Sequence, residues 1–94
     1  KQSMTALIDG WRSAAASGIS ADSDEAQALA ERQVEWLGSV PGTPRGDVKG
    51  YVLGLADMYV ADPRFAANYA TADGDVTGAE FVRDALHFYA NAKL

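Results

Sequence analysis

The segment from Tyr51 to Tyr69 restricts most strongly what this chain can fold into. Its apolar residues recur at spacings of three and four, the period of an α-helix, and they cover most of the helix circumference. A helix of this kind is enclosed by neighbouring elements rather than lying on a surface. Asp62-Pro63 then ends it, because proline disfavours helical backbone in the residue before it and suits the first turn of a new helix. The segment therefore predicts a buried central helix and a short second helix that starts at Pro63.

Ser23 and Asp47 are the expected N-caps of the second and third helices, and the same region contains the first of two further helix-start signals. Asp62 is the expected N-cap of the short helix, because its carboxylate can accept backbone N–H groups of the first turn. The second signal is Thr77-Gly78-Ala79-Glu80, a capping box in which Thr77 and Glu80 each bind the backbone N–H of the other. We therefore assign structural roles to Asp62, Pro63, Thr77 and Glu80.

Helical periodicity extends over the rest of the chain, and no segment alternates as a strand does. A chain of 94 residues is the size of one domain. We predict an all-α, five-helix single domain. The expected helices are Ser3–Ser17, Ser23–Gly38, Asp47–Val60, Pro63–Tyr69 and Gly78–Ala92.

Two helices carry further expectations about packing. The inward face of the second is expected to consist of Ala26, Leu29, Ala30, Gln33 and Leu37. In the central helix, Leu55 is the best core candidate. Gly50 and Gly54 lie four apart on that helix, and they either allow close packing of another helix or admit a flat ligand.

Composition excludes several classes of function. The net charge of −5, from 13 acidic and 8 basic residues, opposes binding to a phosphate backbone, so we expect no nucleic-acid contact by this chain. No run is long and apolar enough to span a membrane, and no secretion signal is present, so we expect a cytoplasmic protein without a membrane partner. The chain opens with Lys1 rather than methionine, and we expect it to be a fragment of a longer protein.

Parts for catalysis or metal binding are few. The chain has no cysteine and a single histidine, His87, which is expected to be a partly exposed helical residue. No serine lies in a Gly-x-Ser-x-Gly turn, and the glycines follow no phosphate-binding pattern. We predict a non-enzyme with no catalytic residue, no cofactor and no metal.

Aromatic residues are the candidates for a binding site. Two tryptophans, four tyrosines, three phenylalanines and two methionines either form the core or line a pocket for a small molecule. The candidate cleft is expected to take apolar drug-like molecules, cationic ones included. Its expected lining residues are Trp11, Trp36, Tyr51, Met58, Tyr59, Phe65 and Tyr89.

Three motifs bring in a family. They are the run from Asp22 to Arg32, the run Asp57-Met58-Tyr59-Val60-Ala61-Asp62-Pro63-Arg64-Phe65, and the run from Glu80 to Leu86. From about Trp11 to Tyr89 the chain resembles the TipAS-type antibiotic-recognition domain. In that family the domain is attached to the C-terminal end of MerR-family transcriptional regulators.

The resemblance implies a globin-like fold with a ligand cleft and recognition of bulky hydrophobic antibiotics. Full-length relatives carry an N-terminal DNA-binding head and a dimerising coiled coil, so the parent is expected to be a homodimer and this fragment a monomer. Relatives also tend to have N-terminal residues that close over the ligand, most of which this chain is expected to lack. Some members capture the antibiotic through a cysteine in the central helix, where this chain has Gly54, which implies non-covalent binding.

Three functions remain open at this point. The first is the ligand-sensing domain of a transcriptional activator, favoured by the start at Lys1. The second is a stand-alone protein that sequesters a drug. The third is a helical module that binds other proteins.

Overall fold

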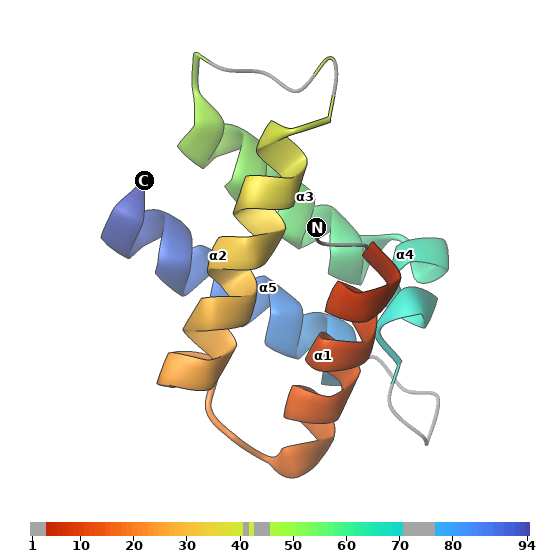
Figure 1. Cartoon of the computed structure of the whole chain (residues 1–94). Helices are drawn as coiled ribbons and strands as arrows, with labels where there is room; N and C mark the ends of the chain where they lie inside the picture. Colours follow the sequence, from red (N-terminus) through yellow and green to blue (C-terminus); the bar gives the residue numbers. More distant parts are fainter. Residues whose placement is uncertain (1–3, 41, 43–45, 71–76) are drawn as a thin grey trace.

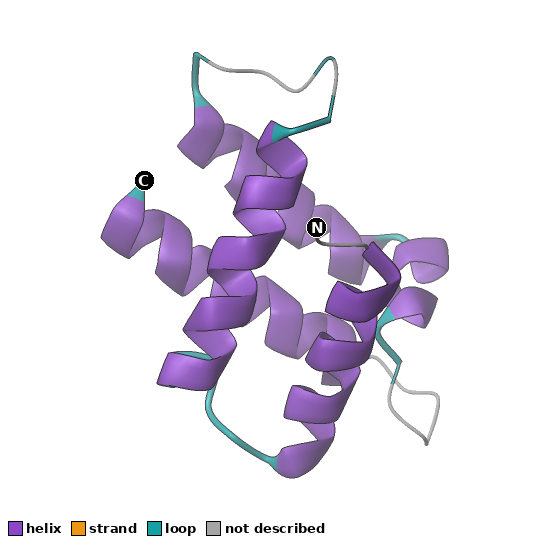
Figure 2. Cartoon of the chain, in the orientation of Figure 1, coloured by secondary structure: helices purple, strands orange, loops and turns teal. Residues whose placement is uncertain are grey.

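The computed structural model describes residues 4–40, 42, 46–70 and 77–94 of the chain. These residues form helices and connecting loops without a strand (Figure 2). The helices are α1 (Met4–Ser17), α2 (Asp24–Gly38), α3 (Val48–Ala61), α4 (Pro63–Asn68) and α5 (Thr77–Lys93). The prediction of an all-α fold is confirmed, and each helix end lies within one residue of its expected position; Ser3 lies outside the described residues. The globin-like arrangement stays a prediction.

Local side-chain chemistry sets most of the helix ends. The side-chain oxygens of Ser23, Asp47 and Asp62 each accept a backbone N–H from the first turn of the helix that follows. Gly18 ends α1 in the left-handed region with φ of 80°, which costs glycine little. The prediction that Asp62 is the N-cap of α4 is thereby confirmed. Helix α5 begins at Thr77, while the hydrogen bonds of the capping box stay a prediction.

The helices pack as a cluster around α5. Figure 1 shows α3 running beside α5, with α2 crossing on one side and α1 and α4 gathered at one end. The contact between α3 and α5 is the most extensive, and α5 also packs against α1, α2 and α4. In contrast, α2 and α3 approach each other only slightly in the described part of the chain. A space is therefore left between these two helices.

The core is formed by the expected faces of the helices. All five residues predicted to face inward on α2 are buried. Trp11 and Leu7 of α1 are completely buried, and the Trp11 ring meets Phe81 of α5 edge-on at 6.0 Å between ring centroids. Val52 and Ala56, rather than Leu55, carry α3 into this core. The prediction for Leu55 was wrong, because its side of α3 faces the space left by α2.

The glycines of α3 do not have the role expected for close helix packing. A Cβ at Gly50 would overlap the capping carboxylate of Asp47, and one at Gly54 would meet open space. Close approach occurs instead at Gly78 of α5, where a Cβ would overlap the backbone carbonyl of Tyr69. Gly78 therefore lets the start of α5 pack directly against the backbone of Tyr69, which follows the last residue of α4.

The remaining sequence expectations concern exposure. His87 is partly exposed, as expected, and its Nε2 lies 2.8 Å from Asp57 Oδ1, which links α5 to α3. None of the described helices combines the length and the hydropathy that crossing a bilayer requires.

Candidate ligand-binding site

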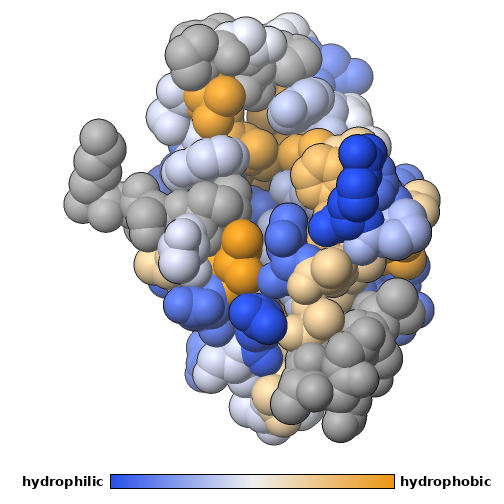
Figure 3. All heavy atoms as spheres, turned by 90° about the vertical axis from the view of Figure 1, so that its right-hand side faces the viewer, coloured by the Kyte–Doolittle hydropathy of each residue, from blue (hydrophilic) through white to orange (hydrophobic). Residues whose placement is uncertain are grey.

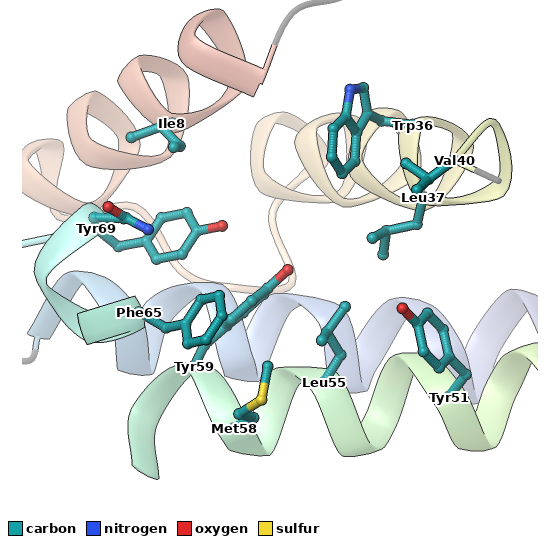
Figure 4. A pocket seen from close by; sticks show the side chains of 11 residues that line it. Ile8, Trp36, Leu37, Val40, Tyr51, Leu55, Met58, Tyr59, Phe65 and Tyr69 are labelled. Atoms are coloured by element: carbon teal, nitrogen blue, oxygen red, sulfur yellow. The ribbon is translucent and has the colours of Figure 1, made fainter. Parts of the chain in front are cut away.

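A pocket of about 300 Å³ fills the space between α2 and α3. Its floor is α3, which contributes Tyr51, Leu55, Met58 and Tyr59 (Figure 4). These residues are spaced by four, three and one, so they lie on one side of the helix. The pocket therefore follows from the sequence pattern of α3 together with the lack of close packing by α2.

The other walls come from three helices and the residues that follow them. From α2 come Trp36 and Leu37, and the side chain of Leu37 points toward α3 from across the pocket (Figure 4). Apolar surface gathers in a recess on the face of the molecule that α1 and α4 border (Figure 3). The remaining lining residues are Ile8, Val40, Phe65, Asn68 and Tyr69.

A buried amide organises one end of the pocket. Gln33 of α2 is completely buried, and its Oε1 accepts a hydrogen bond of 2.9 Å from the indole N–H of Trp11. Its Nε2 donates to the hydroxyl of Tyr59 at 3.0 Å and to that of Tyr69 at 3.3 Å. The two tyrosine rings lie 5.2 Å apart between centroids. Gln33 therefore holds the hydroxyls of two aromatic lining residues, Tyr59 and Tyr69, in fixed positions.

Comparison with known families identifies the domain. The profile of the TipAS antibiotic-recognition domain matches residues 1–89. The chain belongs to the TipAS family. Domains of this family recognise antibiotics, and their known context is the MerR family of regulators. Comparisons with curated proteins and with solved structures give no significant match.

The described lining of the pocket in this TipAS domain is electrically neutral. None of the described residues that line it has a side chain that is charged at neutral pH. Burial raises the pKa of Tyr59, and the neighbouring Tyr69 raises it further. Burial also raises the pKa of Tyr69. Both phenols therefore stay protonated at physiological pH, and they present hydroxyl groups rather than phenolates.

The sequence prediction of the cleft agrees with the geometry in part. The structure brings five of the seven expected residues together in the pocket: Trp36, Tyr51, Met58, Tyr59 and Phe65. It does not bring Trp11 and Tyr89 there. Trp11 is completely buried against Phe81 and is held by Gln33, so it belongs to the core of the TipAS domain.

Tyr89 lies away from the pocket for a different reason. It is on the face of α5 that meets α2, where it lines a separate groove with Glu31 and Phe88. Partial burial raises the pKa of Tyr89, and the charges of Glu31 and Glu35 add to this effect. Helical spacing placed Tyr89 inward but could not show which neighbour it would meet.

Sequence reasoning missed six lining residues: Ile8, Leu37, Val40, Leu55, Asn68 and Tyr69. Two of them carried a usable signal. Tyr69 belongs to the aromatic concentration of the central segment, and Leu55 lies between Tyr51 and Met58 on one side of α3. The other four required knowledge of how the helices pack.

Proposed function

We propose that this TipAS domain is the effector-binding domain of a MerR-family transcriptional activator. In this proposal it binds hydrophobic, antibiotic-like small molecules without a covalent bond, in the pocket between α2 and α3. The observation that carries the proposal is the pocket itself, about 300 Å³ with walls from four helices and the residues that follow them. This is the lower end of the usual size for small-molecule sites, which are mostly apolar with a few polar groups.

The side chains suit flat apolar ligands. Trp36 lies across the pocket from Tyr59 and Phe65, whose rings are 6.0 Å apart between centroids (Figure 4). Aromatic rings on opposite walls can stack on a planar molecule. Met58 of α3 also lines the pocket, and its flexible thioether adapts to ligands of different shape.

Ligand binding would also change the molecule mechanically. Helices α2 and α3 make little direct contact, and a ligand in the pocket would supply the contacts that they lack. A ligand that binds the folded state alone stabilises it by mass action. We propose that this tightening of α2 against α3 is the change that an activator transmits.

The parent protein would contact DNA and dimerise through segments other than this domain. We also propose that the domain binds rather than catalyses and that it works in the cytoplasm, as a regulator of transcription does in bacteria. In support, the titratable groups among the described lining residues are tyrosines, and the two at the inner end of the pocket stay neutral near pH 7.

Titration with a panel of hydrophobic antibiotics tests the proposal, followed by tryptophan fluorescence and by amide chemical shifts. We expect the shifts to cluster on Trp36, Tyr51, Met58 and Phe65. Phe65→Ala should weaken binding, whereas Phe88→Ala should leave it unchanged, because Phe88 is 48% exposed and lies outside the pocket. A panel that leaves all of these amides unmoved would refute small-molecule binding at this site.

The regulatory part of the proposal has its own test. A DNA-binding head encoded in frame upstream of Lys1, and a reporter gene that responds to the same compound, would support an activator. Ligand binding without such a head would favour a protein that sequesters the drug.

A further inference from the structure

The hydroxyl pair of Tyr59 and Tyr69 has one more proton than the described residues can accept. Both N–H groups of Gln33 are used, one on each hydroxyl oxygen. At most one of the two hydroxyl protons can be donated within the pair, and the structure shows no acceptor for the other among the residues it describes.

This spare proton lies beside the pocket. Both tyrosines line the pocket, and Figure 4 shows their hydroxyl oxygens pointing into the space between α3 and α2. The side chains are nevertheless almost fully buried, with 4% of Tyr59 and 3% of Tyr69 exposed. Each hydroxyl oxygen already has Gln33 as a hydrogen-bond partner, so what remains is a proton, and a ligand that brings an acceptor to it gains a hydrogen bond.

The described residues around the pair disfavour a charged ligand on chemical grounds. Each hydroxyl already accepts an N–H from Gln33, so the pair offers a donor to a ligand rather than another acceptor. The described residues that line the pocket provide no carboxylate to neutralise a cation and no basic group to neutralise an anion. A charged group would therefore lose its hydration without an ion partner in return.

We propose that this pocket selects neutral, planar ligands that place a hydrogen-bond acceptor, such as a carbonyl oxygen or an aromatic ring nitrogen, on the Tyr59–Tyr69 hydroxyl pair. The inference rests on the proposed function of the pocket and adds the chemical class of its ligand. In this arrangement Gln33 is a positioning residue, because it holds both hydroxyl oxygens without touching the ligand itself.

Three probes of one shape separate the possibilities: naphthalene, quinoline and N-methylquinolinium. Quinoline replaces one C–H of naphthalene by a ring nitrogen that accepts a hydrogen bond, and N-methylquinolinium carries a permanent positive charge and no acceptor. In a pocket without a donor, quinoline must bind more weakly than naphthalene, because its nitrogen gives up a hydrogen bond to water. With the donor in place, we expect quinoline to bind at least as tightly as naphthalene and N-methylquinolinium to bind more weakly than quinoline.

Variants then locate the donor. We expect Tyr59→Phe combined with Tyr69→Phe to weaken quinoline binding about tenfold while naphthalene stays within about twofold, since one hydrogen bond is lost. Tyr51→Phe is the matched control, because Tyr51 also lines the pocket but no hydrogen bond between its hydroxyl and Gln33 is present in the structure. It should leave the ratio of the two affinities unchanged. Amide-shift titrations give the dissociation constants.

A readout on the unaltered protein covers the case in which the double variant does not fold. The resonance of ¹⁵N-labelled quinoline bound to the native chain should move upfield of its position in hexane, as a hydrogen-bonded ring nitrogen does. A hexane-like position would overturn the inference, and so would tighter binding of N-methylquinolinium or tenfold weaker binding of quinoline than of naphthalene. In those cases naphthalene binding would leave the proposed function intact. If none of the probes or antibiotics perturbs the pocket, both proposals fail.

Discussion

Replacing Gln33 by methionine tests whether the buried amide holds the domain together. The change keeps the length of the side chain but removes its three hydrogen bonds, of 2.9 Å to Trp11, 3.0 Å to Tyr59 and 3.3 Å to Tyr69. Each is worth about 1 kcal/mol net, and the indole N–H of Trp11 is left unpaired in a completely buried position. Burial of the more apolar methionine returns about 1 kcal/mol. We therefore expect a loss of about 2–3 kcal/mol.

Such a loss is large for a domain of this size. At about 0.05–0.15 kcal/mol per residue, 94 residues give a free energy of unfolding of about 5–14 kcal/mol. The expected loss lowers the melting temperature by about 8–24 °C, since each kcal/mol corresponds to about 4–8 °C in a domain of this length. Urea unfolding followed by circular dichroism and by tryptophan fluorescence measures the change, with an unchanged slope as the sign that both states keep their compactness.

A double-mutant cycle separates the hydrogen bonds from a change in packing. Tyr59→Phe removes one hydroxyl and should cost about 1 kcal/mol in the native chain. In the Gln33→Met background it should cost less than half of that, because its amide partner is already gone. A Gln33→Met protein within 0.5 kcal/mol of the native stability, or two additive changes, would refute the structural role given to the amide.

The remaining predictions concern helix ends and titration. Gly78→Ala should destabilise the domain by about 2–3 kcal/mol in urea unfolding, because a Cβ there overlaps the Tyr69 carbonyl. The matched change Gly54→Ala faces open space and should stabilise the domain by about 0.5–1 kcal/mol. Equal effects of the two changes would contradict the packing described. Asp62→Ala should lower the melting temperature at pH 7 and Asp62→Asn, which keeps the cap, should lower it less. The hydrogen bond from Arg64 lowers the pKa of Asp62, so the ionised carboxylate contributes stability above the unfolded pKa near 4. The difference in melting temperature between the native protein and Asp62→Ala should therefore shrink as the pH falls below that value. A difference that stays constant would contradict this role of the carboxylate. Burial raises the pKa of Tyr59 and of Tyr69, so their contribution to stability is complete below the unfolded pKa near 10 and is lost as the pH rises further. An ultraviolet titration should show these two tyrosines ionising late, together with unfolding.

Most of the secondary structure could be predicted because its causes are local. Ser23, Asp47 and Asp62 are short polar residues of the kind that caps helices, and each caps the helix that follows it. The inward face of α2, including the polar Gln33, also follows from spacing alone. A helix boundary depends on a few neighbouring residues, and the sequence contains all of them.

The division between core and pocket depends on packing over long distances in the sequence. Leu55 and Val52 have the same helical period, yet Val52 is buried in the core and Leu55 lines the pocket, because α2 contacts α1 and α5 more closely than α3. Trp11 was predicted to line the cleft, but its N–H donates a hydrogen bond to Gln33, which lies 22 residues away in the sequence. Periodicity states which side of a helix is apolar and leaves open what that side meets.

Gln33 also gives the domain an internal indicator of what occupies the pocket. A single amide joins the two tyrosines of the pocket wall to the indole of α1, and hydrogen bonds that share one amide polarise one another. When a ligand accepts a hydrogen bond from a tyrosine hydroxyl, the polarisation of the Gln33 amide oxygen that accepts the Trp11 N–H should change as well. Trp11, which is completely buried and touches no ligand, would therefore report occupancy through its indole proton resonance. Such a signal would reach α1 through the hydrogen bonds of Gln33.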